Sequence, residues 1–251
     1  KYIKEVLRYL RQQRSGSHES IDRAPGHFRD SAALVYTQVD EKKEWKETPT
    51  KVNVSGGWYD AGDYLKFSLT NAYTCYQLLR AYEENPSIFN YKIYSKSQLN
   101  DLLDEVKFGL DFLEKCYVND STFVFQVGDN RDHELGSRLP VNDTNPYRFA
   151  YTSLSRSQMA FASASFAVAS RVFSSVDSTQ AKIYLQKSEE LFEMSLKHKG
   201  VYWYEKNHEV FYADKSPFDN MLLSASELAI TTGKKYYEEQ IQHYSSLAGK
   251  G

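Results

Sequence analysis

One stretch of the chain carries most of its information: Val54-Ser55-Gly56-Gly57-Trp58-Tyr59-Asp60-Ala61-Gly62-Asp63-Tyr64-Leu65-Lys66-Phe67. Asp60 and Asp63 are separated by Ala-Gly, so both carboxylates can point the same way from a tight turn. The three glycines of the stretch allow positive φ angles and let a substrate approach the backbone. A helix is predicted to begin near Ser68, and the positive potential at its N-terminus favours an ionised aspartate nearby. Such a pair of aspartates can hold one water molecule and deprotonate it.

A bare pair of aspartates with this spacing also occurs as a loop pair, a helix cap or a cation site. The flanking glycines and aromatic residues favour a substrate site, because aromatic rings that carry a polar atom stack on sugar C–H faces and also form hydrogen bonds. The chain is rich in such rings, with 20 Tyr, 14 Phe and 3 Trp. Most of them are expected to fill the core.

Apolar residues recur at helical spacing along most of the chain. They predict helices over about 1–14, 69–84, 96–117, 151–174, 178–198, 218–232 and 234–247. The stretch from about 15 to 57 is polar and contains several breakers, so it is predicted to be irregular. Residues 123–128 form a short strand-like run that leads into a polar loop through Pro140 and Pro146. Antiparallel helix pairs with long loops on alternate connections indicate an all-α toroid or solenoid, with the loops building a site at one end.

Composition excludes several classes of function. The formal net charge of −2 over 251 residues gives no electrostatic case for binding nucleic acid or an anionic membrane surface. No run approaches the roughly 20 apolar residues that a membrane helix needs. Cys75 and Cys116 both fall in apolar helical contexts and are predicted to be free buried thiols.

The stretch Ser55–Phe67 resembles the N-terminal signature of glycoside hydrolase family 9, which reads close to S-G-G-W-Y-D-A-G-D-x-x-K-F. Other segments resemble the same family in the same order, so the resemblance covers essentially the whole chain. These segments are the helix Leu102–Leu113, the run Gln126-Val127-Gly128-Asp129 with Asp132-His133, and Phe211-Tyr212 with Asp219.

This resemblance implies a fold and a reaction. The family forms an (α/α)6 barrel of twelve helices and hydrolyses β-1,4-glucosidic bonds with inversion. Carried over by position, Asp63 is the general base and Asp60 helps to hold the attacking water. His133 and Tyr212 are implied substrate contacts, and we expect Tyr59 to be a third.

The resemblance also implies that this sequence covers only part of the family's catalytic domain. About seven of twelve helices are predicted, so we expect residues 1–251 to be the N-terminal portion of the catalytic domain, with further domains in the parent chain. The family's general acid is a glutamate far toward the C-terminus, and we expect it beyond residue 251, which would leave this fragment inactive alone. No glutamate here stands in a matching context, among Glu205, Glu209, Glu227, Glu238 and Glu239.

Two metal sites of the family are expected to be absent, and no cofactor is expected. A calcium site of some members lies near Asp219, but here Lys215 is close by and Asn220 stands where a glutamate belongs. A zinc site of other members uses cysteines, and the matching positions here read Arg14-Ser15-Gly16 and Gly26-His27. His18 and His27 are therefore expected to be surface or hydrogen-bonded histidines.

The leading interpretation is an endo-acting hydrolase of a β-1,4-linked glucan, which is its expected partner, and the family resemblance implies a secreted or periplasmic protein. An exo-acting β-glucosidase or glucosaminidase of the same family is an alternative, because loop lengths set that choice. From another class, a non-catalytic glycan-binding relative is the second alternative, since the residues after His133, Glu134 to Pro140, lack the family's aromatic platform.

Overall fold

The computed structural model describes residues 2–16, 23–38, 45–144, 148–201, 205–206, 209–214 and 216–248. His18, Pro146 and Lys215 lie outside these residues. The chain divides into two compact units. The first comprises Lys1–Asn71, Pro86–Val118 and Val124–Ser153, and the second comprises Ala72–Asn85, Asn119–Phe123 and Leu154–Gly251.

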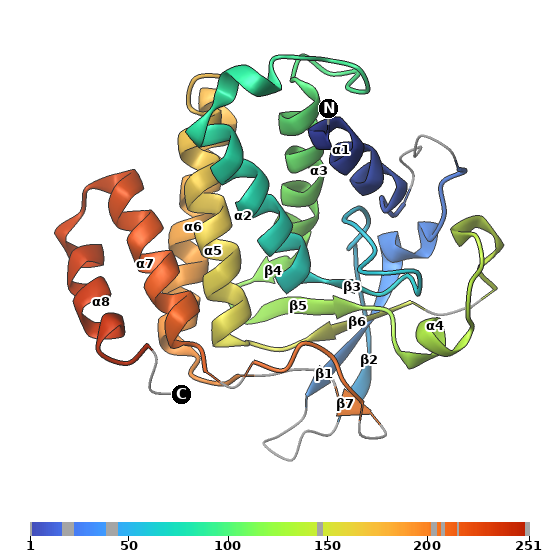
Figure 1. Cartoon of the computed structure of the whole chain (residues 1–251). Helices are drawn as coiled ribbons and strands as arrows, with labels where there is room; N and C mark the ends of the chain where they lie inside the picture. The colour runs from blue at the N-terminus through green and yellow to red at the C-terminus, as the bar shows by residue number, and fades with distance from the viewer. Residues whose placement is uncertain are drawn as a thin grey trace. The chain divides into compact units, whose positions relative to one another are not determined.

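The first unit combines helices with a sheet (Figure 1). Its helices are α1 (Tyr2–Gln12), α3 (Asp101–Cys116) and the short α4 (Asn130–Glu134). Helix α3 begins where the side chain of Asn100 accepts a hydrogen bond from the backbone N–H of Leu103, which satisfies one free donor of the first turn. Short 3-10 helices lie at Phe28–Ala32, Pro86–Phe89 and Pro140–Asn142.

The sheet has six strands, in the order β2-β1-β6-β5-β3 with β4 beside β5. The strands are β1 (Ala33–Gln38), β2 (Trp45–Val52), β3 (Lys66–Phe67), β4 (Tyr117–Asn119), β5 (Thr122–Val127) and β6 (Phe149–Thr152). Strand β1 pairs antiparallel with β2 and parallel with β6, while β5 runs antiparallel to β3 and β6. Two strand ends matter for function: β5 leads into α4, and β3 follows the aspartate-containing stretch.

The second unit is built from helices (Figure 1). It contains α2 (Ser68–Glu84) from Ala72 onward, α5 (Arg156–Phe173), α6 (Ser178–Lys197), α7 (Phe218–Thr232) and α8 (Lys235–Ser245). A two-stranded ribbon pairs β7 (Glu205–Lys206) with β8 (Glu209–Val210) in antiparallel fashion.

Helix α5 is the centre of the second unit, because every residue in it except Arg171 is buried. Its sequence is rich in Ala and Ser, which lets neighbouring helices approach closely. The hydroxyl of Ser163 donates to the Ser188 carbonyl of α6 at 2.7 Å and accepts from the Ser224 hydroxyl of α7 at 2.8 Å. These bonds satisfy the polar groups of a packed helix interface, as burial requires.

The prediction of a mainly helical chain is confirmed. The seven predicted helices correspond to α1, α2, α3, α5, α6, α7 and α8. Among the described residues, no helix is long and apolar enough to span a membrane.

The description as all-α is incomplete, because the structure also contains the six-stranded sheet. The stretch 15–57 was predicted to be irregular, yet β1 and β2 lie in it; the run Ala33–Gln38 pairs with two other strands. The predicted helix 151–174 begins at Arg156, since Phe149–Thr152 pairs with β1 and β5 instead.

Candidate active site

The stretch around Asp60 and Asp63 is a backbone turn of unusual geometry. Gly56 and Gly57 have φ angles of 90° and 73°, and Tyr64 has a φ of 64°. A Cβ on Gly57 would lie 2.6 Å from the ring of Phe112, so this position admits only glycine. Gly62, in contrast, does not adopt a positive φ.

The turn is closed by hydrogen bonds between its own ends and to neighbouring elements. The Asp60 N–H donates to the Leu65 carbonyl at 2.9 Å. The Trp58 N–H donates to the Asn71 side chain of α2 at 2.9 Å, and the Trp58 indole donates to Glu105 of α3 at 2.8 Å. Both carboxylates are therefore held on a backbone that is tied at several points.

A buried group of charges lies behind the turn. Lys66 is fully buried, and its ammonium donates to the carbonyls of Val54 and Gly56 at 2.7 and 2.8 Å. It also lies 2.7 Å from Asp30, whose other carboxylate oxygen accepts from Arg148 at 2.8 Å. Burial alone would raise the pKa of Asp30, but the Arg148 and Lys66 cations hold it well below its usual range.

Arg148 links this group to the loop that follows β5. Its guanidinium lies 2.9 Å from Asp132 of α4 and donates to the carbonyl of Tyr64 at 2.9 Å. Burial raises the pKa of Asp132, and the neighbouring Arg148 opposes that rise. Asp132 also completes a capping box with Asp129, which fixes the start of the five-residue helix α4.

The structure brings together two of the predicted site residues that lie 70 positions apart. His133, on α4, places its Nδ1 2.8 Å from Oδ2 of Asp63. The side chain of Asp63 is 19% exposed and that of His133 is 53% exposed, so the pair lies at the surface of the unit. The other oxygen of Asp63, Oδ1, is buried and has no hydrogen-bond partner among the described residues. Asp60, on the same turn, is half-buried.

Tyr59 is placed differently from the expectation. Its ring is 3% exposed, and its hydroxyl lies 2.5 Å from Nδ1 of His27. A buried, hydrogen-bonded ring argues against a direct substrate contact. The expected contact of Tyr59 therefore stays a prediction that this position does not favour.

His27 was expected to be a surface or hydrogen-bonded histidine, and the structure shows the second. Burial, together with the positive charge of Arg148, lowers its pKa to about 4, so the ring is neutral near pH 7. Its Nε2 lies 2.6 Å from Oδ2 of Asp143. Because an ionised carboxylate can only accept, Nε2 carries the proton and Nδ1 accepts from the Tyr59 hydroxyl.

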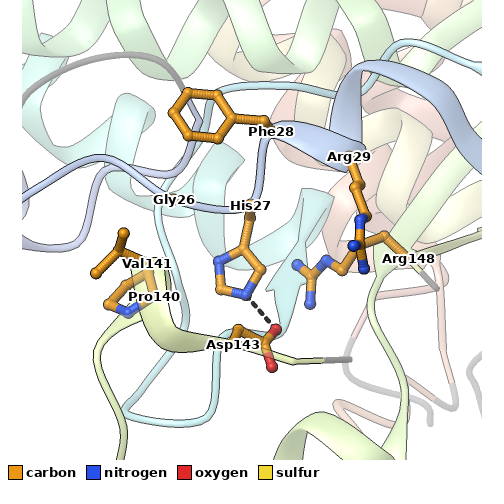
Figure 2. Close-up of a pocket in the computed structure, with 8 residues that line it drawn as sticks. All are labelled: Gly26, His27, Phe28, Arg29, Pro140, Val141, Asp143 and Arg148. Atoms are coloured by element: carbon orange, nitrogen blue, oxygen red, sulfur yellow. Dashed lines mark hydrogen bonds and ion pairs between the residues drawn. The ribbon is translucent and has the colours of Figure 1, made fainter. Parts of the chain in front are cut away.

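His27 and Asp143 form one wall of a cavity of about 200 Å³ (Figure 2). Its lining residues are Gly26, His27, Phe28, Arg29, Pro140, Val141, Asp143 and Arg148. His27, Asp132 and Asp143 could each offer a ligand atom to a metal ion, with these atoms within 4.8 Å of one another. The set does not suit a cation, because Arg148 and Arg138 already pair with the two aspartates.

Tyr212 belongs to the second unit. Its side chain is 45% exposed, and its φ of 48° is unusual for a residue other than glycine. Just beyond it, Asp214 accepts hydrogen bonds from the Ser157 hydroxyl, the Ser216 N–H and the Asn220 amide. Burial raises the pKa of Asp214. The centre of this cluster is thus Asp214, which the sequence had not singled out, rather than Asp219.

Glu227, one of the glutamates considered above as the general acid, is held in place by neighbouring side chains. It accepts from the Tyr76 hydroxyl at 2.7 Å and from Arg171 at 2.7 Å within the second unit. The side chains of Glu205 and Glu209 lie outside those that the structure describes.

Several residues around the turn were missed by the sequence reasoning. They are Asp30, Arg138, Asp143 and Arg148, all of which lie in segments whose sequence shows no helical or strand periodicity. The one available signal was a high density of charge in loops next to the motif, which alone does not distinguish a buried network from a solvated face.

Known proteins resemble this chain over its whole length. The family model described as Glycosyl hydrolase family 9 matches residues 1–251. Endoglucanase 20 of Arabidopsis thaliana is 35% identical over 190 residues, which is 74% of this chain and 38% of that protein. An endoglucanase of Phaseolus vulgaris is 30% identical over 239 residues, which is 94% of this chain and 44% of that protein.

A solved structure shares the fold. A metagenome-derived glycoside hydrolase family 9 endoglucanase superposes with a TM-score of 0.78 at 27% identity, over 96% of this chain and 44% of that one. The likeness supports the fold class implied by the sequence motifs. The chain spans 38% and 44% of the length of the two curated relatives named above.

Proposed function

This chain belongs to glycosyl hydrolase family 9, and from that premise we propose that the protein hydrolyses β-1,4-glucosidic bonds within a glucan. The relatives matched along most of the chain are named endoglucanases, which supports cleavage inside a polymer rather than at its end. The observation that carries the proposal is the Asp63 carboxylate, which is partly exposed and anchored through one oxygen only.

In the proposed reaction Asp63 is the general base. Its Oδ2 accepts from His133, which fixes the carboxylate plane, and the part of the carboxyl group that stays exposed can accept a hydrogen bond from water. A base typically contributes ~100–10,000-fold to such a step, because water is a poor nucleophile until its proton is removed. Asp60, carried on the same turn, helps to orient that water.

Inversion requires a second carboxyl group on the opposite side of the bond. Inverting glycosidases keep the two groups roughly 6.5–9.5 Å apart, which leaves room for the water between base and sugar. We propose no residue for the acid among those described. The substrate contacts proposed for His133 and Tyr212 rest on their matching positions in the family and on the exposure of both side chains.

The test compares isosteric variants of the full-length protein. Asp63→Asn should lower kcat by ~100-fold or more on a β-1,4-glucan, and Asp60→Asn should lower it less, since orienting water matters less than deprotonating it. Reducing-end release from a panel of β-glucans and chitosan oligomers gives the rate and the glycan. Asp120→Asn, an exposed aspartate outside the turn, is the control and should retain wild-type turnover.

The anomeric form of the product, followed by NMR immediately after mixing, reports the stereochemistry. An α-configured new reducing end supports inversion, and a β-configured one excludes it. Near-normal turnover by both Asp63→Asn and Asp60→Asn would refute the assignment of the base to this turn. Glycan binding by the wild-type protein without turnover of any glucan would instead support a non-catalytic glycan-binding protein.

A further inference from the structure

Arg138 lies in the turn that follows α4, residues 135–143, and its guanidinium binds four acceptors. One terminal nitrogen, Nη1, donates to the backbone carbonyls of Asp132 and Gly136, each at 3.1 Å. The other, Nη2, lies 3.3 Å from the Asp132 carboxylate, and Nε donates to Asp143 at 3.0 Å. The side chain is 12% exposed. Arg138 therefore connects α4 to Asp143 at the far end of the turn. Its bonds to Asp132 and Gly136 lie on either side of His133 in the sequence.

The same guanidinium also contacts the segment that carries the candidate base. Its central carbon lies 5.0 Å from the ring centroid of Tyr64, the residue that directly follows Asp63. A guanidinium at this distance from an aromatic ring is attracted to it. Tyr64 has a positive φ, and its carbonyl accepts from Arg148, so its backbone is fixed as well. Arg138 thus bridges the two segments whose side chains meet in the Asp63–His133 hydrogen bond.

Asp143 anchors Arg138 from behind. One of its oxygens accepts from Arg138, and the other accepts from His27 at 2.6 Å. His27 in turn accepts from the hydroxyl of Tyr59, the residue that directly precedes Asp60. The chain of bonds from Tyr59 through His27 and Asp143 ends at Arg138, and Figure 2 shows its His27–Asp143 link at the wall of the cavity. Tyr59, which precedes Asp60, and Tyr64, which follows Asp63, therefore both belong to the network of contacts around Arg138.

We propose that Arg138 is a positioning residue that holds His133 against Asp63 and so sets the orientation of the base. The proposal rests on the function proposed above and adds a residue that acts on the base through His133. This role requires arginine in particular, because a guanidinium carries several N–H donors in fixed directions and can bind all four acceptors at once. A lysine at this position has a single ammonium and cannot reach the Asp132 carbonyl and Asp143 together.

The consequence for catalysis follows from geometry. His133 is on a helix of five residues, too short to hold itself in place, so its position depends on the bonds at both ends of that helix. Asp129 and Asp132 fix the start, and Arg138 fixes the end. Without Arg138, His133 can leave Asp63, and a misplacement of about 1 Å in a reacting group can cost ~100-fold in rate.

The experiment uses Arg138→Met and Arg138→Lys in the full-length protein. Both should lower kcat by ~10–100-fold while KM changes by less than about threefold, because the proposed role concerns the base rather than glycan binding. Arg138→Ala should regain part of its activity when millimolar guanidinium is added.

Arg131→Met is the matched control. Arg131 is on the same helix and pairs with Asp129, but it has no bond to the Tyr64 segment or to Asp143 among the contacts described. It should retain kcat within about twofold. An equal loss of kcat in both variants, or wild-type kcat in Arg138→Met, would overturn the proposal.

A second readout separates this proposal from the proposed function. The ring NMR signals of His133 should shift and broaden in Arg138→Met but not in Arg131→Met, whether or not any glucan is cleaved. If the wild-type protein hydrolyses no glucan of the panel, the proposed function fails while the His133 signals still decide the positioning role. Unchanged His133 signals in Arg138→Met would refute that role even in an active enzyme.

Discussion

Replacing His27 by glutamine tests how strongly this buried imidazole couples folding to pH. Burial and the positive charge of Arg148 lower the His27 pKa from 6.5 to about 4. As the pH falls, the unfolded chain therefore takes up its proton first. Because the unfolded state binds more protons between pH 6.5 and about 4, the free energy of unfolding falls as the pH falls through this window.

The size of the effect follows from the two pKa values. Each pH unit of difference corresponds to about 1.36 kcal/mol, so a fall from 6.5 to about 4 removes roughly 3 kcal/mol once both forms are protonated. About 2 kcal/mol of this is already lost at pH 5. Glutamine at this position does not titrate, yet its amide can accept from Tyr59 and donate to Asp143.

The assay is urea unfolding of the full-length protein, followed by tryptophan fluorescence at several pH values between 7.5 and 5. Between those limits the wild type should lose about 2 kcal/mol more stability than His27→Gln. Asp214, whose pKa burial raises, titrates in both proteins and cancels in the difference. The reasoning is refuted if His27→Gln and the wild type lose stability in parallel.

Four further outcomes are expected. Gly57→Ala should cost at least about 2 kcal/mol in urea unfolding, because φ is positive and a Cβ would meet a ring at 2.6 Å. Gly62→Ala, where a Cβ meets nothing within 4 Å, should stay within about 0.5 kcal/mol. Lys66→Met should cost ~3–5 kcal/mol by the same assay, because it leaves a buried carboxylate short of one cation. Dialysis against EDTA should leave the melting temperature unchanged, because the Asn220 amide donates to Asp214 where a cation would otherwise be needed. About one calcium per chain in elemental analysis after the dialysis would contradict this.

Helices could be predicted from the sequence because their signal is local. The apolar faces of α6 and α7 repeat at helical spacing, and the observed bounds Ser178–Lys197 and Phe218–Thr232 lie within one residue of those expected. The strands β1 and β6 could not be predicted in the same way. They pair with each other across more than 100 positions, so only the folded chain reveals that pairing.

The residues of the candidate site likewise fall into those with a local sequence signal and those without one. Asp60 and Asp63 carry a local motif, and their family resemblance extended the prediction to His133. Arg138 and Asp143 carry no motif, since their role depends on where the turn after α4 meets the aspartate-containing turn. A charged residue in a loop is usually solvated, so burial was the missing information for both.

The buried charges behind the turn are explained by the backbone that they support. Burying an ion pair rarely adds stability compared with apolar packing, because desolvation offsets the attraction. Here the cations are aimed at carbonyls of the turn: Lys66 donates to Val54 and Gly56, and Arg148 donates to Tyr64. These carbonyls lie where left-handed residues prevent regular pairing, and a buried carbonyl without a donor is costly. Cations must therefore enter the core to satisfy a turn of this shape, and Asp30 and Asp132 must follow to neutralise them.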